Sequence, residues 1–189
     1  MKHAELQKLV DEQIAHGFGR QQVFDTLAAL RPDIPVKKLA KAVRYTAPLH
    51  TRTHYQGTQR ALLALIVLNA ALAFAMRWAV TTHRPGIAGL VFLSFATVLL
   101  AVAVHRWQGA SIRWLALANL WSAIPVLNEL RTGEVHEPLM LASRMLSILI
   151  GAVAWYLAVK VYPRPTEEPS LPGTPPLVRF APEPGEVFR

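Results

Sequence analysis

The stretch ALLALIVLNAALAFAM at residues 61–76 contains no charged residue, and neither does GIAGLVFLSFATVLLAVAV at residues 86–104. A helix needs about 20 mostly apolar residues to cross the hydrocarbon core of a bilayer. The first stretch reaches this length when it is continued to Val80. The second ends at residues 105–107, a basic and aromatic boundary typical of headgroup depth. Both stretches are therefore predicted to be transmembrane helices.

Two further apolar stretches follow, at residues 111–130 and 139–162. The third stretch is short, and its central part covers only about 25 Å at about 1.5 Å per residue. A re-entrant segment is therefore an alternative there. The fourth carries Arg144 close to its start, where the guanidinium can reach the headgroups. The predicted fold class is all-α, with a four-span transmembrane helical bundle at 61–80, 86–104, 111–130 and 139–162.

The distribution of Lys and Arg near the ends of these spans predicts the orientation, because positive charge is retained on the cytoplasmic side. One side of a four-span arrangement holds Lys41, Arg44, Arg52, Arg60, Arg106, Arg113, Lys160, Arg164 and Arg179. The other side holds Arg77, Arg84, Arg131 and Arg144. Both termini are therefore predicted to lie in the cytoplasm, with the protein in the cell (inner) membrane.

The composition agrees with a membrane protein that carries a basic head. Hydrophobic residues make up 52% of the 189, yet the formal net charge is +8. This charge lies mainly in the first 60 residues. The chain has no cysteine, which excludes disulfides and thiolate metal sites.

Residues 1–48 are predicted to form a small three-helix cytoplasmic domain, followed by a linker at residues 49–60. Apolar residues recur at helical spacing in three runs, and Gly17 and Pro32 punctuate them. The third run places a basic flank beside its apolar face: Lys37, Lys38, Lys41 and Arg44. These four side chains are predicted to contact the anionic headgroups of the lipid bilayer, at about 1 kcal/mol each before screening. The alternative is that they are only solvated. Few basic residues and no aromatic platform argue against nucleic acid as a partner.

Residues 3–47 resemble a ubiquitin-associated-type three-helix domain, in which a Gly-Phe loop joins the first two helices. The residues that carry the resemblance are Gly17, Phe18, Arg20, Gln21, Gln22, Val23 and Leu27. His16 stands where such domains usually carry methionine, and ubiquitin binding is not carried over. The resemblance implies a compact module that binds a cytoplasmic protein partner.

Within the spans, small residues recur every four positions at Ser143, Ser147 and Gly151. Such a stripe lets a second helix approach closely, either inside the bundle or in a homo-oligomer. Three other residues are candidates for a polar pocket between the first and third spans: Asn69, Asn119 and Ser122. The pocket would suit a small transporter or channel subunit, which is the alternative function.

The sequence carries no catalytic motif, and no enzyme activity or cofactor is expected. Acidic residues near His136, between the last two spans, are metal-ligand types. They lack the spacing of a metal motif, so a solvated loop is the preferred interpretation. From Pro163 onward the chain is rich in proline and is predicted to be a disordered tail, residues 163–189, with apolar islands at Leu177, Val178 and Phe180. The predicted function is a non-catalytic scaffold or accessory subunit.

Overall fold

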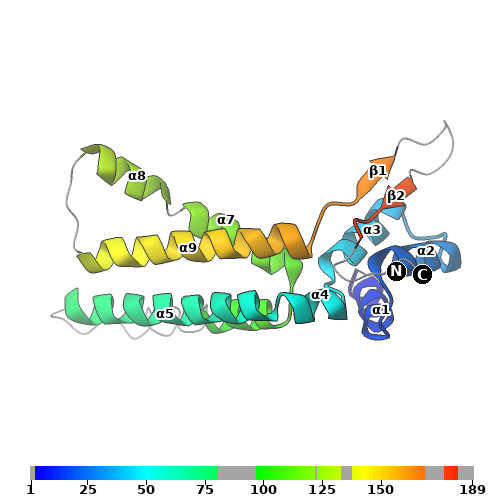
Figure 1. The fold of residues 1–189 in the computed structure, drawn as a ribbon, viewed down its shortest axis with the longest axis horizontal. Helices are drawn as coiled ribbons and strands as arrows, with labels where there is room; N and C mark the ends of the chain where they lie inside the picture. Colours follow the sequence, from blue (N-terminus) through cyan, green and yellow to red (C-terminus); the bar gives the residue numbers. More distant parts are fainter. Residues whose placement is uncertain (1–2, 81–96, 122, 133–137, 169–176, 183–189) are drawn as a thin grey trace. The chain divides into compact units, whose positions relative to one another are not determined.

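The computed structural model describes residues 3–80, 97–121, 123–132, 138–168 and 177–182, and these are mostly helical (Figure 1). The helices are α1 (His3–Ala15), α2 (Arg20–Leu30), α3 (Val36–Tyr45), α4 (Leu49–His54), α5 (Gln56–Val80), α7 (Gly109–Trp121), α8 (Ala123–Thr132) and α9 (Pro138–Val161). Residues 97–105 are also helical. Two short strands follow, β1 (Thr166–Glu168) and β2 (Leu177–Arg179).

The chain divides into two compact units. We call residues 1–56 with 159–189 the head unit, and residues 57–158 the membrane unit. The N-terminal and C-terminal parts of the chain therefore belong to the same folded body.

The head unit is built on α1, α2 and α3, whose apolar faces form one core. Helix α1 ends because Gly17 adopts a left-handed backbone conformation with φ 89°, and its N–H donates to the carbonyl of Ile14 at 3.0 Å. Such a conformation suits glycine, which has no Cβ to clash. The stop that the sequence predicts at Gly17 is therefore present. Residues 49–60, the predicted linker, are mostly helical, because α4 and the first turn of α5 occupy them.

The tail differs more from its prediction. Residues 166–168 and 177–179 are not disordered but pair as antiparallel strands, with Glu167 opposite Val178. The proline-rich composition was misleading here because the prolines flank these strands, and no proline interrupts either of them.

The membrane unit supplies helices that are long and apolar enough to cross a bilayer. Three such segments lie within the described residues: Gln56–Met76, Gly109–Asn128 and Pro138–Val161. Many of their large apolar side chains point outward, including Val67, Trp114 and Leu149. An extensive apolar surface of this kind is typical of contact with lipid. The three helices indicate an integral membrane protein.

Part of the predicted second span, at residues 81–96, lies outside the described residues. Its C-terminal end is described and closes in a defined turn. Trp107 has φ 54°, and the N–H groups of Trp107 and Gln108 donate to the carbonyls of Val104 and Ala103 at 3.1 and 3.0 Å. This pair of bonds is the Schellman motif. A left-handed backbone conformation at a residue with a side chain costs about 1–2 kcal/mol. Trp107 adopts this conformation with its ring buried.

The side chain of Gln59, near the start of α5, is buried against the same turn. Its Nε2 donates to the carbonyls of Val104 and His105 at 2.8 and 3.0 Å. The last carbonyls of a helix have no partner within it, so a side-chain donor satisfies them. Gln59 therefore ties α5 to the end of the helix at residues 97–105.

The third apolar stretch contains two helices, α7 and α8, where the sequence predicts one segment at residues 111–130. Pro125 falls in the first turn of α8, a position that proline tolerates because no intrahelical donor is needed there. The proline cannot donate to the carbonyl of Trp121, which is the last residue of α7. Residue 122 lies outside the described residues, and the segment Gly109–Asn128 as a whole is long and apolar enough to cross a bilayer.

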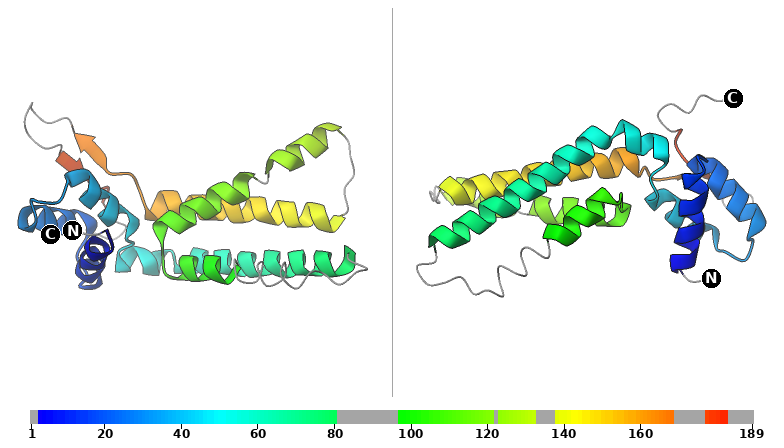
Figure 2. Two further views of the ribbon diagram at one scale, coloured as in Figure 1. Left: turned by 180° about the vertical axis from the view of Figure 1, so that it is seen from behind. Right: turned by 90° about the horizontal axis from the view of Figure 1, so that it is seen from below.

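Helices α5 and α9 run antiparallel and side by side within the membrane unit, and α7 packs against α9 (Figure 2). Gly151 on α9 makes the second contact possible. A Cβ built there would lie 2.9 Å from both the backbone nitrogen and the Cγ of Leu120 on α7. Because the backbone nitrogen cannot move aside as a flexible side chain would, even one methyl group is too large at this position.

We therefore expect Gly151→Ala to destabilise the membrane unit by about 1–3 kcal/mol, the usual cost of overpacking. The matched control is Gly57→Ala in α5, where an added Cβ meets nothing within 4 Å. Alanine favours a helix over glycine, so this control should leave stability unchanged or raise it slightly. Thermal unfolding of both variants in detergent, followed by far-UV circular dichroism, measures the difference. Equal midpoints for the two variants would contradict the close contact.

Candidate protein-interaction site

The C-terminal segment lies on helix α2 of the head unit and completes its core. Val178 and Phe180 are 3% and 9% exposed and belong to the same apolar cluster as the buried residues of α1, α2 and α3. The ring of Phe180 packs on that of Phe24, with centroids 5.8 Å apart and planes at 57°. Tilted aromatic pairs of this kind are favourable. The head core is thus partly built from residues more than 150 positions away in sequence.

One side chain on α2 holds the backbone of this segment at two points. The carboxamide of Gln21 donates from Nε2 to the carbonyl of Val178 at 3.3 Å and accepts from the N–H of Phe180 at 2.9 Å. A neighbouring β-strand likewise offers one hydrogen-bond donor and one acceptor to the backbone of an extended chain. Gln21 therefore binds the segment through its backbone, and the apolar cluster selects the side chains at alternate positions.

The side chains between these anchors point outward. Leu177 and Arg179 are exposed, and the Arg179 guanidinium is 3.2 Å from the Glu168 carboxylate in a solvated ion pair. Exposed pairs of this kind contribute little. Burying Val178 and Phe180 is favourable by about 1.5–3 kcal/mol for each side chain. Ordering a residue costs about 1–2 kcal/mol of backbone entropy, so the two side chains offset the ordering of only a few residues.

A buried arginine joins three parts of the head unit. Arg20, the first residue of α2, is only 3% exposed. Its guanidinium donates to the carbonyl of Thr46, from Nε at 3.2 Å and Nη2 at 3.1 Å, and also to the carbonyl of Val161. These carbonyls follow or end helices α3 and α9, where the helix dipoles are negative. The cation thus donates hydrogen bonds to carbonyls at two helix ends.

The four basic residues of α3 differ in how far they are exposed. Lys37, Lys38 and Lys41 are exposed, whereas Arg44 is half-buried with its guanidinium 5.5 Å from the centre of the Tyr45 ring. Three of the four predicted lipid contacts are therefore open to an anionic surface. Arg44 is partly engaged with the head itself.

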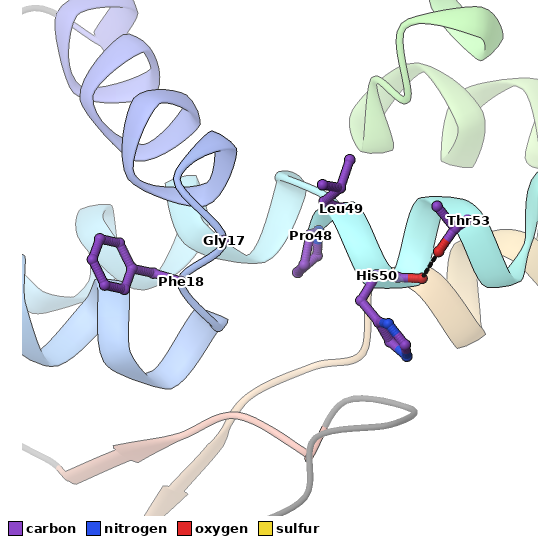
Figure 3. A pocket seen from close by; sticks show the side chains of 6 residues that line it. All are labelled: Gly17, Phe18, Pro48, Leu49, His50 and Thr53. Atoms are coloured by element: carbon purple, nitrogen blue, oxygen red, sulfur yellow. Dashed lines mark hydrogen bonds between the residues drawn. The ribbon is translucent and has the colours of Figure 1, made fainter.

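A shallow hollow of about 280 Å³ lies beside the loop that joins α1 and α2 (Figure 3). Phe18 approaches from that loop, and the remaining wall comes from α4 and the residue before it. The lining residues are Gly17, Phe18, Pro48, Leu49, His50 and Thr53. The Thr53 hydroxyl donates to the carbonyl of His50 at 2.8 Å, which leaves the hollow with a mainly apolar rim. The Gly-Phe loop of the ubiquitin-associated resemblance thus borders a surface depression.

Inside the membrane unit, Asn69 is hydrogen bonded to α9. Its Nδ2 donates to the Ser147 hydroxyl at 3.3 Å, and its Oδ1 accepts from the Ser143 hydroxyl at 3.2 Å. Bonds of this kind between transmembrane helices contribute about 0.6 kcal/mol each. The structure thus joins one residue of the expected polar pocket to two residues of the expected packing stripe.

Two of the three residues of that pocket, Asn69 and Asn119, lie within the described part of the chain. The Asn119 amide donates to the carbonyl of Leu115 in its own helix at 2.9 Å, and Ser122 lies outside the described residues. The polar groups of Asn69 and Ser143 therefore serve helix packing.

The candidate metal ligands around His136 lie at residues 133–137, outside the described part of the chain. Among the described residues, no three His, Asp or Glu side chains gather in a group that could hold a metal ion.

Comparison of the chain with protein-family models, curated proteins and solved structures finds no match.

Sequence reasoning missed two parts of this site. Gln21 and Arg20 were identified only as residues that resemble a ubiquitin-associated-type domain. Their hydrogen-bond partners could not be predicted, because these lie at Val178 and Val161, far along the chain. The only available signal was the alternation of apolar residues at Val178 and Phe180 within a proline-rich segment. That alternation is the period of a half-buried strand.

We expect Arg20→Met to destabilise the head unit by at least about 2 kcal/mol. The buried carbonyls of Thr46 and Val161 would lose their shared donor, and each orphaned group costs about 1–3 kcal/mol. The control is Lys8→Met, which changes an exposed cation on α1. Hydrogen exchange of the α2 and α3 amides measures local stability. Unchanged protection in Arg20→Met would show that water or another donor replaces the guanidinium.

Proposed function

We propose that the protein is a non-catalytic scaffold or accessory subunit of the cell (inner) membrane, with four spans and both termini in the cytoplasm. The observation that carries this proposal is the head unit itself. It is a folded module outside the candidate spans that holds an extended segment through the Gln21 carboxamide. A folded module that holds an extended segment through its backbone is suited to recruiting a protein partner in the same way.

The shared core of the head unit supports an even number of membrane crossings. Residues 1–56 and 159–189 pack together, so the chain before α5 and the chain after α9 lie on the same side of a bilayer. The described residues supply three candidate spans, which is an odd number. The uncharged stretch at residues 86–104 is long enough to be the fourth. This parity favours four spans over three.

The excess of Lys and Arg on the side of the head supports a cytoplasmic location for both termini. The exposed lysines of α3 add a surface for anionic lipid headgroups, the second partner in this proposal. The Ser143, Ser147 and Gly151 stripe is used in contacts with α5 and α7, so a homo-oligomer would require another face.

A set of single cysteines tests the topology, since the native chain has none. In a four-span protein, cysteines at Thr53, Gln108 and Arg164 react only after the membrane is made permeable, whereas one at Arg131 reacts in intact cells. If only α5 and α9 cross, Gln108→Cys and Arg131→Cys are both labelled from outside. If three segments cross, Thr53→Cys and Arg164→Cys label from opposite sides, which would contradict the proposal.

Affinity purification after mild solubilisation tests the scaffold role. The full chain should recover at least one protein that a chain lacking residues 1–55 does not recover, because the head carries the docking surfaces. A variant with Lys37, Lys38 and Lys41 changed to glutamine controls for lipid contact and should keep that protein. Recovery of the protein alone from both the full and the shortened chain would count against a scaffold.

A further inference from the structure

We propose that the site on α2 formed by Gln21, Phe24 and the apolar cluster around them binds an extended segment of a partner protein. The partner segment carries two apolar side chains at alternate positions, and the chain's own Val178 and Phe180 occupy the site until it arrives. This inference rests on the proposed scaffold function and deepens it, because it names the surface, the chemistry of the partner and the way access is controlled.

The seated segment shows what the site recognises. Two side chains at alternate positions are buried, and the residue between them, Arg179, is exposed. The polar contacts from α2 go to the backbone groups of Val178 and Phe180, which every extended chain offers. Recognition of this kind selects the apolar–any–apolar pattern in an extended conformation, and another segment with that pattern fits equally well.

The resident segment is held by contacts that a competitor can replace. Its strand, β2, is three residues long and pairs only with the three residues of β1 within the described part of the chain. The ion pair that accompanies this pairing, between Arg179 and Glu168, is exposed at both side chains. Phe180 lies beyond β2 and rests on Phe24 and Gln21. The segment thus behaves as a tethered ligand.

The fraction of time that the C-terminal segment fills the site sets the apparent affinity of the site for a partner segment. If the tail fills the site about 90% of the time, the apparent affinity of a partner segment falls about tenfold. A change that releases the tail should raise that affinity by the same factor. The C-terminal segment would in this way keep the scaffold closed to weak ligands.

The test uses the purified full chain in lipid nanodiscs and a fluorescent peptide with the sequence of residues 177–182, LVRFAP. In the variant Phe180→Asp the tail cannot fill the apolar site. We expect this variant to bind the peptide at least about tenfold more tightly than the wild type, measured by fluorescence anisotropy. A peptide with aspartate in place of its valine and phenylalanine should not bind.

Two substitutions on α2 in the Phe180→Asp background test the geometry. Gln21→Leu removes both backbone hydrogen bonds and should therefore weaken peptide binding at least about tenfold. Gln22→Leu changes the exposed neighbouring residue and should leave binding unchanged. Equal effects of the two substitutions would overturn the role of Gln21.

A second chain guards against loss of the head fold in Phe180→Asp. It carries a protease site inserted between residues 169 and 176, so that cutting frees an otherwise native C-terminal segment. An excess of the peptide should then displace that segment. A cut segment that cannot be displaced would be a permanent part of the core, and the proposal would fail.

The proposal would also be overturned if the peptide failed to bind the Phe180→Asp chain while its head stayed folded. Equal binding of the peptide to the wild type and to this variant would overturn it as well. These outcomes depend only on purified components. They therefore leave the scaffold proposal standing, and an affinity purification without partners would equally leave the peptide result intact.

Discussion

The apolar core shared by the N-terminal helices and the C-terminal segment is the constraint on which the rest of the structure depends. Val178 and Phe180 are buried with residues of α1, α2 and α3, so the two ends of the chain cannot lie on opposite sides of a bilayer while the core is intact. A polypeptide that leaves one side of a membrane and returns to it must cross an even number of times. The shared core of the head unit is therefore the observation on which the proposed four-span topology depends.

Arg20 shows how such a core tolerates a buried charge. A guanidinium taken out of water needs compensation, and carboxylates usually provide it. Here carbonyl oxygens at the C-terminal ends of α3 and α9 accept its hydrogen bonds, and the helix dipoles add favourable potential. These carbonyls would otherwise be orphaned at helix ends. One side chain therefore satisfies the ends of two helices, and their carbonyls in turn stabilise the cation.

Sequence reasoning recovered the features that depend on local order and missed those that depend on distant partners. The helix stop at Gly17 and the boundary after the apolar stretch that ends at Val104 follow from backbone chemistry within a few residues. The contacts of Gln21 and Arg20 join residues 141 or more positions apart, and no periodicity encodes them. The proline-rich composition predicted disorder at residues 177–179, where the structure has a strand. The prolines lie beside this strand and not within it.

The polar residues of the spans show the same division. Asn69, Ser143 and Ser147 were each identifiable as unusual in an apolar helix, but the sequence assigned Asn69 to a pocket and the serines to a packing face. Their hydrogen bonds to one another follow from the side-by-side course of α5 and α9.

The two outward surfaces of the head respond to different conditions. The lysines of α3 act through charge, which salt screens over about 8–10 Å at ordinary ionic strength. The site on α2 acts through buried apolar area and backbone hydrogen bonds, which salt affects much less. Because the lysines and the tail-binding residues lie on different helices, contact with anionic lipid does not require the tail to leave its site. In the proposed scaffold, lipid composition and a competing segment would therefore act on the head independently.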